Sequence, residues 1–403
     1  MENKNVDNSF QKLRQIKNPM IIKILTSSLM VLSIINIRFG FFSISDFILS
    51  FFLIYLIFFK HNVKLTRSFI VVFLIFISLY SISALSSGYS NLYDEILFYG
   101  FLYKYFFISA IFLIFTNIHI KETFLTKLVF TCWIVLSCWA IYYAFFFLGN
   151  PLLSVLVPNQ ISFPGTGSAE SINPDSHLYA YLVGLLGLYL TIFSDGSKRL
   201  LFLIVTLFII LLTGSRNPLA LYGIVFLLYF INSRVDKKIL MLSGIIIFIP
   251  ILASQFIFLE NILPSMRSFQ FDLLNDDSAG SRIKKLFIAI DEYMNYSLIF
   301  GQSVFGSSLI WTDGIHTIIL VHFGIVGLIL YLSILFYYFT KLYLIASKGN
   351  AQAKKIFYLS IYLFMGLFIT EFILTSRGAI LALVPLVVLI NNLNNDSRVT
   401  IVD

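Results

Sequence analysis

The chain has 403 residues, of which 59% are apolar and 12% are charged, and its mean hydropathy is +0.90. This composition excludes an ordinary water-soluble globular protein, because soluble domains carry about 25% charged residues. A helix that crosses a membrane needs about 20 predominantly apolar residues, so the apolar residues suffice for about twelve spans and leave no room for a soluble domain of ordinary size.

Twelve apolar segments are predicted to cross a membrane as helices, and we therefore expect an all-α, polytopic membrane protein. These segments are residues 20–37, 40–59, 68–86, 95–116, 124–148, 176–193, 199–213, 217–231, 239–257, 315–345, 356–374 and 377–391. They divide the chain into a polar tail (1–19), spans one to nine (20–257), one long loop (258–314), spans ten to twelve (315–391) and a second tail (392–403).

The distribution of Lys and Arg predicts the orientation of these spans. About twenty of the 28 basic residues share one side when the N-terminus is placed inside, and the positive-inside rule then makes both tails cytoplasmic. The loop 258–314 would face outward. Because the basic residues are dispersed over separate loops, the net charge of +8 indicates membrane orientation and not nucleic-acid binding.

Two arginines stand in tight turns on the outer side, where topology gives no reason for a cation. They are Arg216 in LLTGSRNPLALYG and Arg377 in ILTSRGAILA. In each turn a hydroxyl residue precedes the arginine and a signal for a helix start or break follows it, so we expect both guanidinium groups near helix N-termini. The alternative is that these arginines extend to phospholipid headgroups.

The long loop contains a predicted amphipathic helix. After the turn NDDSAGS, the stretch RIKKLFIAIDEYMNYSLIF has apolar residues at helical spacing, with Arg282 in the first turn and Lys285 on another face. The segment FGQSVFG then supplies Gly301 and Gly306. The following apolar run places His316 at the predicted mouth of the tenth span.

Three outward-facing arginines and a histidine favour a site for a diphosphate. The planar guanidinium donates paired hydrogen bonds to phosphate oxygens and keeps its charge when it is partly desolvated. His316 could accept a proton from an attacking hydroxyl, or it could be a structural histidine that bonds to a carbonyl. Asp313 is either a competing base or the N-cap of the tenth span.

Lys104 lies inside the fourth predicted span, and a charge in that position is a functional candidate, with a lipid phosphate or Glu371 as its partner. The five histidines show no ligand spacing, so we expect no metal and no other cofactor.

The stretch from SRIKKLFIAIDEYMNYSLIFGQSVFG to GIHTIILVHFGIVGLILYL resembles the shared signature of bacterial O-antigen ligases and Wzy-type O-antigen polymerases. The resemblance covers roughly residues 160 to 390, and LLTGSRNPLALYGIVF is similar to the family's Ser-Arg-Gly turn. Thr317 replaces the usual Asn after the histidine, and Asn217 replaces the usual Gly after the arginine. The positions that carry the signature are Arg216, Arg282, Gly301, Gly306, His316, Gly324 and Gly327.

This resemblance implies a metal-independent glycosyltransferase of the GT-C type at the periplasmic face of a bacterial inner membrane. Its substrates would be undecaprenyl-pyrophosphate-linked oligosaccharides, its environment membrane lipids, and a chain-length regulator protein is a candidate partner. Arg216 and Arg282 would hold the donor pyrophosphate, and His316 would deprotonate or orient the acceptor hydroxyl. The further candidates for substrate binding are Arg377, Asp313, Lys285 and Lys104.

Two kinds of enzyme share this signature. A polymerase joins lipid-linked repeat units, whereas a ligase transfers the polymer to the lipid A core. The modest outer loop and the departure from His-Asn favour the polymerase. The alternative that is not an enzyme is a transporter of the same lipid-linked sugar. Transporters tend to carry internal repeats and charged residues near the membrane midplane, and this sequence shows no repeat.

The predicted topology can be tested by labelling single cysteines in intact cells. Residues near 232–238 and 347–355 should be inaccessible to an impermeant thiol reagent, because they belong to the basic loops, whereas positions 276 and 307 should be labelled. Labelling of position 351 from outside would contradict the orientation.

Overall fold

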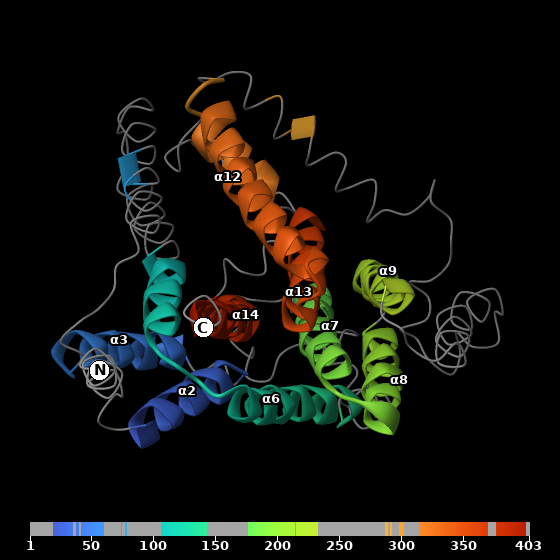
Figure 1. The fold of residues 1–403 in the computed structure, drawn as a ribbon. Helices are drawn as coiled ribbons and strands as arrows, with labels where there is room; N and C mark the ends of the chain where they lie inside the picture. Colours follow the sequence, from blue (N-terminus) through green and yellow to red (C-terminus); the bar gives the residue numbers. More distant parts are fainter. Residues whose placement is uncertain are drawn as a thin grey trace, which may run out of the picture.

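The computed structural model describes residues 19–34, 38–39, 42–59, 74, 77–78, 106–142, 176–213, 215–232, 287–288, 291, 298–301, 315–369 and 376–399. These residues are helical apart from short turns and one antiparallel hairpin of two-residue strands, β1 (Arg38–Phe39) and β2 (Phe42–Ser43) (Figure 1). The helices are α2 (Pro19–Ile34), α3 (Ile44–Phe59), an unlabelled helix (Phe106–Asn117), α6 (Glu122–Tyr142), α7 (Ser176–Phe193), α8 (Gly196–Leu212), α9 (Arg216–Asn232), α12 (Ile315–Ser347), α13 (Ala351–Ile369) and α14 (Ser376–Val399).

The predicted all-α class is confirmed, and these helices coincide with ten of the twelve predicted segments. Three of them are long and apolar enough to cross a membrane: Glu122–Tyr142, Ile315–Ser347 and Arg377–Asn394. Such helices indicate association with a membrane. The predicted segments 68–86 and 239–257 lie outside the described residues, except for three positions of the first.

Side chains at the helix starts explain two of the boundaries. Before α13, Asn350 accepts a hydrogen bond from the backbone N–H of Ala353 (2.9 Å), which satisfies one of the free donors of the first turn. Before α3, the carboxylate of Asp46 accepts a hydrogen bond from the backbone N–H of Ser43 (2.6 Å), in the manner of a capping box. Local sequence therefore determines where these two helices begin.

Helix α7 lies in the middle of the bundle and packs against α6, α8, α9, α13 and α14 (Figure 1). Its side chains from Tyr179 to Ile192 are all buried. Gly187 lets α8 approach closely, because a Cβ at this position would lie 2.8 Å from Cβ of Thr206. Small residues at such contacts bring helices together where lipid supplies no hydrophobic driving force between them.

Hydrogen bonds between helices join their ends at one end of the bundle. All of the bonded residues belong to loops or to the tail that the charge distribution predicts to be cytoplasmic. The contacts therefore agree with a common side for these loops. The three hydrogen bonds are donated by Asn392 Nδ2 to Ile120 O (2.9 Å), by Gln352 Nε2 to Glu122 Oε2 (2.9 Å) and by Lys354 Nζ to Asn232 O.

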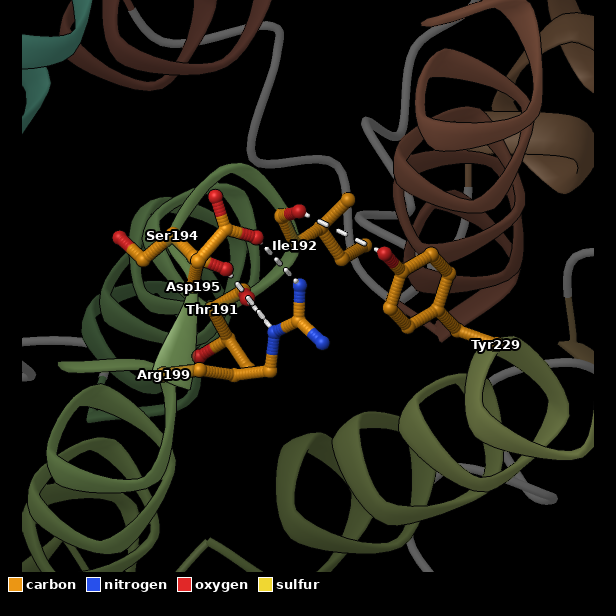
Figure 2. A network of polar contacts seen from close by, with 6 residues as sticks. All are labelled: Thr191, Ile192, Ser194, Asp195, Arg199 and Tyr229. Carbon is orange, nitrogen blue, oxygen red and sulfur yellow. Dashed lines mark hydrogen bonds and ion pairs between the residues drawn. The ribbon is translucent and has the colours of Figure 1, made fainter. Parts of the chain in front are cut away.

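Arg199 closes the turn between α7 and α8 at this same end (Figure 2). Its Nε donates to the carbonyl oxygens of Thr191 (3.2 Å) and Ser194 (2.9 Å), which lie at the C-terminal end of α7. Its Nη2 also contacts Asp195 (3.2 Å), but that carboxylate is 96% exposed, so this ion pair adds little stability. The main role of Arg199 is to satisfy carbonyls that have no partner within the helix.

Replacing Arg199 by Ala should therefore lower the stability of the bundle by about 1–2 kcal/mol, since hydrogen bonds from a charged donor to backbone are lost. The thermal unfolding midpoint of the detergent-solubilised protein measures the effect. Lys198→Ala is the matched control, because Lys198 carries the same charge on the neighbouring exposed position. Equal midpoints for the two variants would show that charge, and not the contact with α7, is what matters.

Candidate functional site

The two arginines in the predicted turns begin helices. Arg216 is the first residue of α9 and Arg377 is the second residue of α14. Since α9 and α14 reach the hydrogen-bonded end with Asn232 and Asn392, they begin at the opposite end of the bundle. The prediction that both arginines stand at helix starts is confirmed. Arg377 is only 8% exposed, and the side chain of Arg216 lies outside the described part.

Three buried tyrosines hold the helices together below this end. Tyr362 of α13 meets Tyr181 of α7 and Tyr222 of α9 edge to face, with both pairs of ring centroids 6.4 Å apart. The hydroxyl of Tyr362 donates to the carbonyl of Tyr181 (3.3 Å). Tyr222 lies six residues after Arg216, or about 9 Å along the helix. These contacts fix the beginning of α9 relative to α7 and α13, against which α14 also packs.

Helix α12 is interrupted at Gly324, although the sequence predicts one span over residues 315–345. The arm 325–347 after the interruption is by itself long enough to cross a membrane. Gly324 has φ 64° and ψ −166°, which is outside the helical region. His316 and Tyr331 lie fifteen residues apart in sequence, which corresponds to about 22 Å in a straight helix. Their ring centroids are nevertheless 5.3 Å apart. The chain therefore folds back at Gly324, and the arm 315–323 runs beside the beginning of the arm 325–347.

The segment Leu298, Ile299 and Gly301 of the preceding loop docks on this break. The backbone N–H groups of Ile325 and Val326 donate to the carbonyls of Leu298 (3.1 Å) and Ile299 (3.3 Å). These N–H groups open the second arm and would otherwise lack partners. Irregular backbone inside an apolar bundle is tolerated only when its polar groups are satisfied in this way.

Glycine is required on both sides of the contact. Gly301 has φ 78°, and a Cβ on it would lie 2.6 Å from the backbone nitrogen of Gly324. A Cβ on Gly324 would lie 2.5 Å from the carbonyl carbon of Ile299. Gly327 in turn leaves room for Phe323, so that the two arms can pack directly against each other. Three of the four glycines of the sequence signature thus serve one local structure.

The fold-back determines the surroundings of His316, which is the second residue of α12. The imidazole lies beside Tyr331 of the second arm, and its ring centroid is 5.6 Å from that of Phe364 in α13. It is partly buried in the seam between α12 and α13. His322, on the same arm, is close to the turn at Gly324 and is 7% exposed.

The structure does not bring the other predicted site residues to this seam. Arg282, Lys285, Asp313 and Lys104 lie outside the described residues, as does most of the predicted amphipathic helix. Within the described part, no group of three or more His, Cys, Asp or Glu side chains could hold a metal ion. Sequence reasoning missed Tyr331, because the sequence gives no signal that separates it from the many other aromatic residues of the spans.

Comparison with known proteins adds no relative: no protein-family model and no curated protein matches the chain.

The fold-back can be tested by cross-linking. Cysteines at positions 316 and 331, in a chain whose Cys132 and Cys138 are replaced by Ser, should be bridged by thiol cross-linkers with a reach of about 10 Å. The control pair at 332 and 347 has the same spacing within the unbroken second arm and should remain unbridged. Equal cross-linking of both pairs would contradict the fold-back.

Proposed function

We propose that the chain is a surface-polysaccharide polymerase, a metal-independent glycosyltransferase that joins undecaprenyl-pyrophosphate-linked oligosaccharides at the periplasmic face of a bacterial inner membrane. The proposal includes twelve spans, cytoplasmic termini and a GT-C-like architecture. It draws on the sequence resemblance, on the charge distribution and on the helix starts at Arg216 and Arg377.

The observation that carries the proposal is the docking of Gly301 on the break at Gly324. The resemblance rests on short motifs that lie far apart in the sequence, and a chance likeness gives no reason for them to meet. Here the loop glycine and the span glycine pack backbone to backbone, and the chain between them carries His316. The loop motif and the motif of α12 therefore belong to one structural unit, which supports the proposal that they serve a common site.

In the proposed reaction, Arg216 and Arg282 bind the pyrophosphate of the donor and stabilise the negative charge that it gains on leaving. His316 accepts the proton of the acceptor hydroxyl while the acceptor oxygen bonds to the anomeric carbon. The bond between that carbon and the pyrophosphate oxygen breaks, and undecaprenyl pyrophosphate leaves with the electron pair. In this proposal Arg377, at the start of α14, binds a second anionic group of a lipid-linked substrate.

A transporter of the same lipid-linked sugar is favoured by one observation, because transporters also bind substrates at broken helices. The two functions differ in chemistry. Purified protein in lipid vesicles with defined lipid-linked repeat units should convert them into a ladder of longer chains, whereas a transporter would leave their length unchanged. Transfer to a lipid A core acceptor, without a ladder, would instead indicate a ligase.

Within this assay, His316→Ala should lower the rate by about 10²–10⁴-fold, the usual contribution of a general base. Thr317→Asn is the matched control, because it restores the form usual in the family at the next position and leaves the imidazole in place. We expect it to keep the wild-type ladder. A normal ladder from His316→Ala at wild-type membrane abundance would remove His316 from the mechanism.

A further inference from the structure

We propose that Tyr331 is a positioning residue for His316: its hydroxyl accepts a hydrogen bond from the imidazole when His316 holds the proton of the acceptor sugar. This inference rests on the proposed function, and it adds a residue that the sequence signature does not contain. Tyr331 acts through the histidine and has no contact with substrate in this proposal.

The placement of the two rings supports this role. The ring centroids of His316 and Tyr331 are 5.3 Å apart with an interplanar angle of 52°, so the two side chains are neighbours, and both the ring nitrogens of His316 and the hydroxyl of Tyr331 are buried. On another side, the imidazole of His316 packs edge to face with the ring of Phe364, at an interplanar angle of 74°. The ring of Phe364 in turn packs on that of Phe339, with the centroids 5.1 Å apart. The aromatic seam between α12 and α13 therefore limits how the imidazole can move.

The hydroxyl of Tyr331 has the capacity that this role requires. It is buried, and it has no hydrogen-bond partner among the residues that the structure describes. A buried polar group without a partner costs stability, so its presence calls for an explanation. A Phe at this position would fill the same space without that cost. The cost of retaining a hydroxyl is explained if the hydroxyl is used during the reaction.

The proton transfer makes the imidazole a stronger partner for this hydroxyl, because the N–H that faces it then belongs to a charged ring. Neutral imidazole has one N–H donor, whereas protonated imidazole has two, and a buried imidazolium needs an acceptor for each. In many enzymes a carboxylate orients the histidine. Neither α12 nor α13 contains an Asp or Glu along its described length. Of the ring contacts described for His316, those with Tyr331 and Phe364, only the contact with Tyr331 brings a polar atom.

The step is balanced without a further reactant. The acceptor hydroxyl gives its proton to one imidazole nitrogen as its oxygen bonds to the anomeric carbon. The other imidazole nitrogen keeps its hydrogen and donates it in a hydrogen bond to Tyr331 Oη. The proton then passes from the first nitrogen to the departing pyrophosphate or to water, which returns His316 to its neutral form.

The fold-back at Gly324 is what brings these two residues together. His316 lies eight residues before the turn and Tyr331 seven residues after it, so the two arms place both side chains at the same height. In a straight helix the same residues would be too far apart to interact. The contact of Gly301 with Gly324 therefore also determines the surroundings of His316.

The experiment compares Tyr331→Phe with Tyr338→Phe in the vesicle assay. Both changes remove one hydroxyl and keep the ring, and both residues lie on the second arm of α12, two helical turns apart. We expect Tyr331→Phe to lower kcat about tenfold to a hundredfold, the effect of losing a hydrogen bond to a charged group, with KM for the donor unchanged within a factor of about two. Tyr338→Phe should keep the wild-type kcat.

A second measurement does not depend on activity. Nitrogen-15 spectra of histidine-labelled protein in bilayers, with His316→Gln identifying the signal, should show that Tyr331→Phe shifts an imidazole nitrogen of His316 and that Tyr338→Phe does not. Equal kcat values and unchanged spectra for Tyr331→Phe would overturn the inference. A wild-type protein that makes no ladder would overturn the proposed function, and the spectra alone would then decide whether Tyr331 bonds to His316.

Discussion

The pairing of the loop backbone at Leu298 to Gly301 with the broken helix at Gly324 is the contact on which the candidate site depends. A break within an apolar helix leaves N–H groups without acceptors, and no water is available inside a membrane to bind them. The carbonyls of Leu298 and Ile299 supply the acceptors. Because these loop carbonyls replace the missing helix carbonyls, the arm that carries His316 can turn back and lie beside Tyr331 and Phe364.

The two ends of the bundle are built differently. At one end, side chains link α6, α9, α13, α14 and the turn after α7 through hydrogen bonds to backbone and to one carboxylate. At the other end, α9 and α14 begin with arginines, and the fold-back of α12 packs chiefly on α13. The central α7 and its tyrosine contacts connect the two. Hydrogen bonds hold the helices together at the first end, and the candidate residues Arg216, Arg377 and His316 belong to the second.

Much of this fold follows from the sequence. Hydropathy alone predicts α7 and α9 to within a residue at each boundary, since their apolar runs end at turns with polar residues. The Ser-Arg pairs predict the helix starts at Arg216 and Arg377. The break at Gly324 could not be predicted in the same way, because the run from 315 to 345 is uniformly apolar and glycine is common in membrane helices. Its cause lies in carbonyls about 25 residues earlier in the chain, at Leu298 and Ile299.

The interlocking of Gly301 with Gly324 also restricts how this protein can change over evolutionary time. The atoms that a new Cβ would meet on either glycine are backbone atoms, and backbone is present whatever the neighbouring residue is. A replacement of one glycine therefore cannot be relieved by shortening a side chain elsewhere, as it can at Gly187, where part of the crowding comes from the side-chain tip of Thr206. No second side-chain mutation restores the space, so neither glycine can be replaced in a stepwise series of single mutations.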